Sequence, residues 1–259
     1  MKWMALLMIL STQAVSAPVS AQEPMPEPPL RVLFGHQSVG SDILAGLSRV
    51  APELLAGPAN PGGQVLLVDR LVGLNGNPIS KIEAFEEAVT EQAATLDAAM
   101  FKLCYVDFDA TTDVPRLFSA YTSAHDRLRQ AYPRLILAHI TTPLTTIQSG
   151  FKSWVKQMLG KPPRGLVENL KRSEFNTLLR ARYAGKEPIF DLAELESRSP
   201  AGEVVSYEGR VPMLYPAYTH DGGHLNETAQ QLIGTAFAEF LLTLAEERGE
   251  PASAERSAP

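Results

Sequence analysis

The sequence is poor in cysteine and in positive charge, and beyond its first residues it has no long apolar run. Cys104 is the only cysteine among 259 residues, so an internal disulfide and a cysteine-built zinc or iron–sulfur site are excluded. The chain has 23 Lys and Arg against 29 Asp and Glu, an acidic balance that argues against nucleic acid as a partner. No segment is long enough for stable membrane insertion.

The first 21 residues have the pattern of a secretory signal peptide. Lys2 precedes an apolar run over residues 3–10, and small residues follow as far as Ala21. Cleavage after Ala21 is favoured over Ala17, because Pro18 would follow the scissile bond at Ala17. Cleavage removes one lysine and no acid, so the formal charge changes from -6 to -7. We expect an exported protein, periplasmic or extracellular.

Composition predicts one folded domain between two disordered terminal segments. Residues 22–29 are rich in proline and are expected to be a disordered leader. Residues 247–259 are small and polar and are expected to be a disordered tail. The domain over residues 30–246 is long enough for a substantial core. Nothing in the sequence predicts an oligomeric state.

Short apolar segments alternate with amphipathic ones along this domain. This alternation predicts a three-layer α/β/α sandwich with a central parallel sheet of about five strands. The carboxyl ends of parallel strands meet at one edge, where such folds place their sites. The expected strands are residues 30–34, 64–68, 101–106, 135–140 and 188–192. The expected helices are residues 41–50, 167–183 and 225–244. Two further helices are expected, one that opens at a Ser80-x-x-Glu83 capping box and one that starts at Asp113.

An acid and a histidine three residues apart open the last long helix, in Asp221-Gly222-Gly223-His224-Leu225-Asn226. The two glycines allow a tight turn, in which the Asp221 carboxylate can reach Nδ1 of His224 and leave Nε2 free. This is the base and its orienting acid in a serine hydrolase.

The candidate nucleophile is Ser38, directly after the first expected strand. It lies between Gly35 and Gly40, which allow a sharp strand-to-helix turn, and the following helix directs N–H groups at the same place. A helix-capping serine is the competing interpretation for Ser38 taken alone.

The order of these elements resembles the SGNH (GDSL-type) hydrolase superfamily over roughly residues 30–245. The resemblance implies Ser38 as nucleophile, His224 as base and Asp221 as its orienting acid. Two motifs depart from the family pattern. After the first expected strand, Gly35-His36-Gln37-Ser38 replaces Gly-Asp-Ser. After the third, Tyr105-Val106-Asp107 lacks the asparagine of Gly-x-Asn-Asp. An α/β-hydrolase is disfavoured, because only one strand precedes Ser38 and the acid and base share one turn.

The remaining site residues follow from the same resemblance and from the loops. Gly76 is the best match for the oxyanion glycine, and Asn77 is the alternative side-chain donor. Asp107, unable to donate while ionised, is then expected to bind a substrate hydroxyl. Residues 141–165 form a basic insertion with Trp154 that we expect to contact substrate, together with Tyr218. An ordinary solvated loop is the competing interpretation of the insertion.

The favoured function is hydrolysis of small acetyl-type esters, on a small molecule or a glycan, without a metal or organic cofactor. Two alternatives stay open: an acyltransferase that passes the acyl group to a glycan with the same triad, and a non-catalytic glycan-binding protein. A partial metal site at His220, Asp221 and His224, joined by His36, is a weaker alternative, because His220 and His224 are not expected to lie on a helix, where the usual i, i+4 pair of ligands lies.

Overall fold

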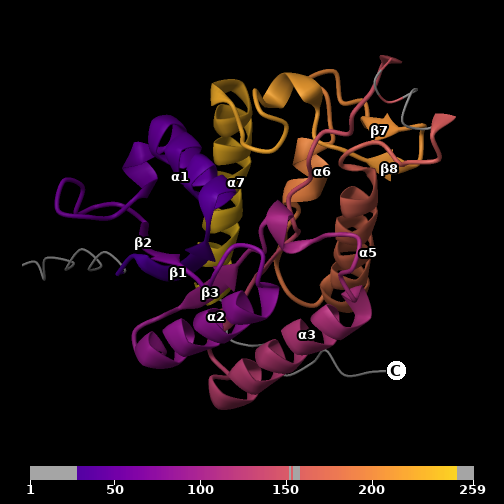
Figure 1. Ribbon diagram of the computed structural model, residues 1–259. Helices are drawn as coiled ribbons and strands as arrows, with labels where there is room; N and C mark the ends of the chain where they lie inside the picture. The colour runs from indigo at the N-terminus through magenta and orange to yellow at the C-terminus, as the bar shows by residue number, and fades with distance from the viewer. Residues whose placement is uncertain (1–27, 152, 154–157, 250–259) are drawn as a thin grey trace, which may run out of the picture.

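The computed structural model describes residues 28–151, 153 and 158–249 (Figure 1). The predicted signal peptide and the leader as far as residue 27 lie outside the described residues. The same holds for Trp154 in the insertion and for residues 250–259 of the predicted tail. The last helix runs to Gly249, three residues into the stretch predicted as tail.

A parallel sheet forms the centre of the fold, in the order β2-β1-β3-β4. These strands are β1 (Leu30–His36), β2 (Val65–Leu71), β3 (Ala98–Phe101) and β4 (Ile136–Leu137). A parallel pair, β5 (His139–Ile140) and β6 (Ile189–Phe190), continues the layer after β4. An antiparallel pair, β7 (Ser206–Tyr207) and β8 (Val211–Pro212), stands apart. The α/β class with a central parallel sheet, as predicted, is confirmed.

Helices cover both faces of the sheet. One core lies under α1 (Ser38–Val50), α6 (Leu192–Glu196) and α7 (Glu227–Gly249). The other lies under α2 (Pro78–Gln92), α3 (Val114–Ala131) and α5 (Leu166–Tyr183). Three short 3-10 turns complete the described elements: η1 (Pro52–Leu54), η2 (Tyr105–Asp107) and η3 (Pro216–Tyr218). Alternate residues of β1 point into each core, so the sheet is buried on both sides, as parallel sheets are.

The first and last helices are in close contact (Figure 1). A Cβ built on Gly46 would lie 1.9 Å from the carbonyl oxygen of Gln230, and one on Gly234 would lie 2.4 Å from the carbonyl carbon of Gly46. Only glycine therefore allows this crossing of α1 and α7. The crossing brings the two ends of the domain together.

Several element boundaries differ from the prediction. The third strand is Ala98–Phe101 rather than 101–106, because these four residues are the ones that pair with residues 32–35 of β1. The fourth predicted strand is divided: β4 pairs with β3, while β5 pairs with β6. Helix α2 begins at Pro78, with Asn77 rather than Ser80 as its N-cap. No helix in the described part of the chain is long and apolar enough to cross a membrane.

Candidate active site

Ser38 is the first residue of α1 and follows β1 after a single residue, Gln37. Gln37 gives the helix no side-chain cap, since its amide nitrogen donates to the carbonyl oxygens of Val72 and Gly73, each at 3.0 Å. The N–H of Ser38 therefore stands at a helix end, where no intrahelical acceptor exists. This places a hydroxyl and a backbone donor together at the carboxyl edge of the sheet.

Asp221 and His224 form a tight pair on the loop before α7. Oδ2 of Asp221 lies 2.6 Å from Nδ1 of His224, and Oδ1 accepts the backbone N–H groups of Gly223 and His224, each at 2.9 Å. Burial opposes ionisation of Asp221, but these hydrogen bonds outweigh it and hold the pKa of that carboxyl well below its ordinary value. An ionised Asp221 fixes the tautomer of His224 with the proton on Nδ1, so Nε2 can accept a proton.

Ser38 and His224 are connected through neighbouring residues. Oγ of Ser38 lies 3.9 Å from Sγ of Cys104, and the hydroxyl of Tyr105, the next residue, lies 3.3 Å from Nε2 of His224. Asp42, one turn after Ser38 on α1, accepts the N–H of Leu225, which follows His224, at 3.1 Å. No hydrogen bond joins Ser38 to His224 in the described part of the chain.

Asp107 and Gly76 are engaged with each other rather than exposed to a substrate. The Asp107 carboxylate accepts hydrogen bonds from the N–H groups of Gly76 (2.9 Å) and Cys104 (2.6 Å), and two from Nζ of the fully buried Lys81 (2.9 and 2.7 Å). These four bonds fill the acceptor capacity of a carboxylate. In place of the expected substrate contact, Asp107 ties the loop after β2 to the loop after β3. The N–H expected at Gly76 as an oxyanion donor is used in this tie.

Asn77 and Tyr218 also have structural contacts that sequence reasoning did not anticipate. The side-chain oxygen of Asn77 accepts the N–H of Ser80 at 3.1 Å and caps α2, while its amide nitrogen, the group expected to donate to an oxyanion, takes no part in this bond. Tyr218 is 1% exposed and packs in the core between the sheet and α7, so it does not line an open site. The expected substrate contact at Trp154 falls on a residue outside the described ones.

The histidines weighed as metal ligands are not grouped. His36 is 1% exposed, and its Nε2 contacts Asp69 Oδ1 at 2.5 Å. Nδ1 of His224 is taken by Asp221. Within residues 28–151, 153 and 158–249, no group of three or more His, Cys, Asp and Glu side chains is arranged to hold a metal ion.

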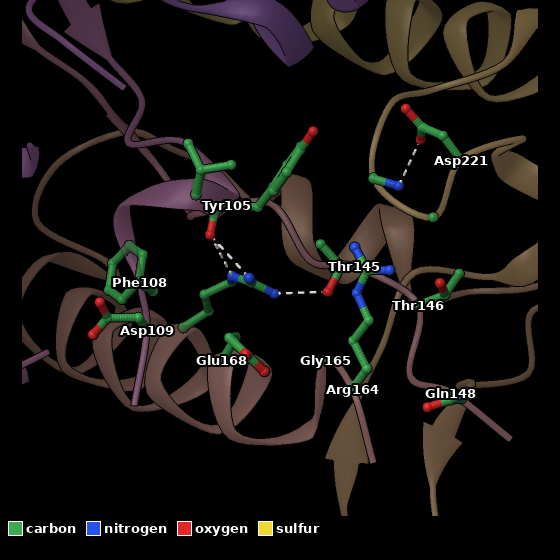
Figure 2. Close-up of a pocket in the computed structure, with 14 residues that line it drawn as sticks. Tyr105, Phe108, Asp109, Thr145, Thr146, Gln148, Arg164, Gly165, Glu168 and Asp221 are labelled. Carbon is green, nitrogen blue, oxygen red and sulfur yellow. Dashed lines mark hydrogen bonds between the residues drawn. The ribbon is translucent and has the colours of Figure 1, made fainter. Parts of the chain in front are cut away.

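A pocket of about 670 Å³ opens beside the Asp221 turn (Figure 2). Its walls come from η2, from the extended segment after β5, from the start of α5 and from the turn itself. The lining combines two aromatic rings, hydroxyls, an amide and charges of both signs: Tyr105, Phe108, Asp109, Thr145, Thr146, Gln148, Arg164, Glu168, Arg172 and Asp221. Figure 2 shows the Arg164 side chain extending between Thr145 and Thr146. The predicted basic insertion thus supplies one wall.

Arg172 holds the floor of this pocket. It is 3% exposed, and its guanidinium donates twice to the carbonyl oxygen of Tyr105, at 2.9 and 3.1 Å, and once to the hydroxyl of Thr145 at 2.9 Å. Burial lowers the pKa of Arg172 to about 10, which leaves it charged at neutral pH. A buried charge with these bonds fixes the backbone of Tyr105.

Buried ionisable groups lie on the α1 and α7 side of the sheet, close to this edge. Lys102 is 1% exposed, and its Nζ has no hydrogen-bond partner among the described residues. Glu196 is fully buried and accepts the N–H of Leu144 at 2.6 Å. Burial lowers the pKa of Lys102 and raises that of Glu196 to about 8. Burial also raises the pKa of Asp42, although the hydrogen bond from the N–H of Leu225 acts to lower it.

Several of these residues were missed from the sequence. Asp42 and Lys81 carried the one usable signal, because each places a charge on the apolar face of an amphipathic helix. The roles of Tyr105 and Arg172 carried none, since only the folded chain brings η2, α5 and the turn before α7 together.

Comparison with known proteins gives a fold likeness. No family model and no curated protein sequence matches the chain. Among solved structures, a G-D-S-L family protein from Desulfitobacterium hafniense is similar, with a TM-score of 0.52, 11% identity, and 81% of this chain and 98% of that chain covered. Esterase EstA from Pseudoalteromonas has a TM-score of 0.50 and 10% identity, with 83% of this chain and 98% of that chain covered. TesA has a TM-score of 0.51 and 11% identity, with 83% of this chain and 99% of that chain covered.

These identities are low, while the coverage extends over nearly the whole of each neighbour. The shared feature is therefore the arrangement of strands and helices over most of this chain, and it agrees with the resemblance found in the sequence motifs. The chain has the fold of the SGNH (GDSL-type) hydrolases.

Proposed function

We propose that this protein is a serine esterase that hydrolyses small acyl esters, with Ser38 as nucleophile, His224 as general base and Asp221 as the acid that orients it. The 2.6 Å contact between Asp221 and Nδ1 of His224, on a turn tied by Asp42 to the helix of Ser38, carries the proposal. A base held in one tautomer beside a serine at a helix N-terminus has the parts that acyl transfer needs.

The reaction runs in two halves. Oγ of Ser38 attacks the ester carbonyl carbon while its proton passes to Nε2 of His224, and the carbonyl electron pair moves to oxygen. The intermediate then expels the alcohol, which takes the proton from Nε2, and an acyl-enzyme remains. Water repeats the sequence and releases the acid.

Initial rates on p-nitrophenyl acetate test this proposal. Ser38→Ala should lower kcat by about 10⁴-fold or more, because the covalent step is lost. Ser41→Ala, an exposed serine of the same helix, is the control and should keep the wild-type rate. A Ser38→Ala protein with the rate of the wild type would refute the serine mechanism.

The pocket beside the turn supports a polar, hydroxyl-bearing alcohol, such as a sugar, as the leaving group. Arg164 and Glu168 supply donors and acceptors, and Tyr105 supplies a ring face. Arg164→Ala should raise KM about tenfold for an acetylated sugar but leave p-nitrophenyl acetate unaffected. Arg116→Ala, on the surface of α3, is the control. Equal effects on both substrates would remove the pocket from substrate binding.

Product analysis separates the hydrolase from the acyltransferase alternative. Free acetate in the presence of a sugar acceptor supports hydrolysis, and an acetylated acceptor supports transfer. We also propose export through residues 1–21, so the N-terminus of the protein recovered outside the cytoplasm should be Gln22.

A further inference from the structure

The hydroxyl of Tyr105 lies against the imidazole of His224. Its oxygen is 3.3 Å from Nε2 and 3.4 Å from Nδ1, and the two rings meet edge to face with centroids 5.6 Å apart. Asp221 already accepts the Nδ1 proton, so Nε2 carries the free lone pair. Its near-equal distances to the two nitrogens place the hydroxyl beside the imidazole and off the lone-pair axis of Nε2, so it does not occupy the position from which Ser38 must deliver its proton.

Contacts on two sides fix this position. The buried Arg172 holds the carbonyl oxygen of Tyr105 with two hydrogen bonds. On the other side the ring lies over Gly223, where a built Cβ would be 2.8 Å from Cζ of Tyr105. A side chain placed this tightly is preorganised, which is what a donor to a transient charge requires.

Of the two expected oxyanion donors, the N–H of Gly76 is engaged elsewhere, because it donates to Asp107. The Asn77 side chain is oriented by its oxygen, which caps α2. The N–H of Ser38 provides one donor at the start of α1. A tetrahedral intermediate is usually stabilised by more than one donor, so a further donor is needed near Ser38.

We propose that the Tyr105 hydroxyl donates a hydrogen bond to the oxyanion of the tetrahedral intermediate formed on Ser38. This inference rests on the proposed esterase function. When Oγ of Ser38 bonds to the carbonyl carbon, its proton moves to the lone pair of Nε2 of His224, and the carbonyl electron pair moves to oxygen. The Tyr105 hydroxyl, beside the same imidazole, then donates its hydrogen bond to the negative oxygen. Tyr105 keeps its own proton throughout.

A bond of this kind favours the transition state over the bound substrate, and such bonds raise kcat rather than lower KM. Burial, followed by the nearby Cys104 and Asp221, raises the pKa of Tyr105 to about 12. The hydroxyl thus remains a donor throughout the range in which esterases are assayed.

The substitution Tyr105→Phe tests the inference with two acetate esters that differ in leaving group. We expect kcat to fall about 10²-fold for both p-nitrophenyl acetate and ethyl acetate, with KM unchanged, because the oxyanion forms with either ester. Affinity for a boronic acid, which binds a serine as a tetrahedral anion, should fall by the same factor as kcat/KM. Tyr132→Phe, at the end of α3, is the control and should match the wild type.

A loss confined to ethyl acetate would show that Tyr105 assists the departing alkoxide, and would overturn the inference. An unchanged kcat, or a lower kcat with unchanged boronic acid affinity, would overturn it too. Ser38→Ala separates a failure of this inference from a failure of the proposed function. If Ser38→Ala is inactive while Tyr105→Phe is fully active, only the role of Tyr105 is contradicted. A rate independent of Ser38 contradicts the proposed function itself.

Discussion

Asp42 connects the helix of the candidate nucleophile to the turn of the candidate base. It lies four residues after Ser38, and its carboxylate accepts the N–H of Leu225 at 3.1 Å and the amide of Gln230 at 3.4 Å. Leu225 directly follows His224. One side chain on α1 thus sets the separation of two groups that lie 186 residues apart in the chain.

Replacing Asp42 tests this connection. Asp42→Ala should lower kcat about 10- to 100-fold with a small change in KM, because a displacement of about 1 Å between reacting groups has effects of that size. Asp42→Asn keeps an oxygen acceptor for Leu225 and should recover most of the activity. Equal loss in both variants would indicate that the carboxylate charge, rather than the hydrogen bond, matters.

The crossing of α1 and α7 should be sensitive to a single methyl group. Gly46→Ala places Cβ 1.9 Å from the Gln230 carbonyl oxygen, and we expect the free energy of unfolding to fall by about 1–3 kcal/mol. Gly57→Ala has nothing within 4 Å of the new Cβ and is the control. Urea denaturation measures both, and equal stability of the two variants would contradict the close packing.

Glu196 should make stability depend on pH. Its folded pKa of about 8 lies above the ordinary 4.5, so the native state binds the proton more tightly than the unfolded chain. This contribution is fully present below pH 4.5 and is lost as the pH rises through 8. Glu196→Gln should therefore match the wild type at pH 4.5 and exceed its free energy of unfolding at pH 9, by on the order of 1–3 kcal/mol.

The control for Glu196 is Glu194→Gln on the same short helix, where the carboxylate is exposed and paired with Arg198. This variant should keep the pH dependence of the wild type. A Glu196→Gln protein whose stability falls with pH as steeply as the wild type would assign the dependence to another group.

Tyr105 and Gly223 should behave as one unit. Gly223→Ala pushes against the Tyr105 ring and should lower kcat as Tyr105→Phe does. Combined, the two substitutions should cost little more than one alone, because both remove the same interaction. Losses in ln kcat that add in full would show that Gly223 acts on the Asp221 turn independently of Tyr105.

The sequence predicted the layers and the meeting of the chain ends, because alternating apolar segments leave few arrangements for a parallel sheet. It misplaced β3, since Phe101 to Val106 is more apolar and aromatic than the alanines of the actual strand. Pairing with β1 determines the position of β3, and that pairing covers only Ala98–Phe101. The Lys81–Asp107 ion pair was also missed, because a lysine in an amphipathic helix is ordinarily solvated.

The central claim is that Ser38 is the nucleophile, and covalent labelling by an aryl phosphonate tests it most directly. Mass spectrometry of the digested wild type should find one adduct, on Ser38, and Ser41→Ala should be labelled at the same position. His224→Ala should be labelled far more slowly, because the base that activates the serine is gone. An adduct on Cys104 or Tyr105 instead, or an unlabelled Ser38 in a preparation that hydrolyses p-nitrophenyl acetate, would contradict the account.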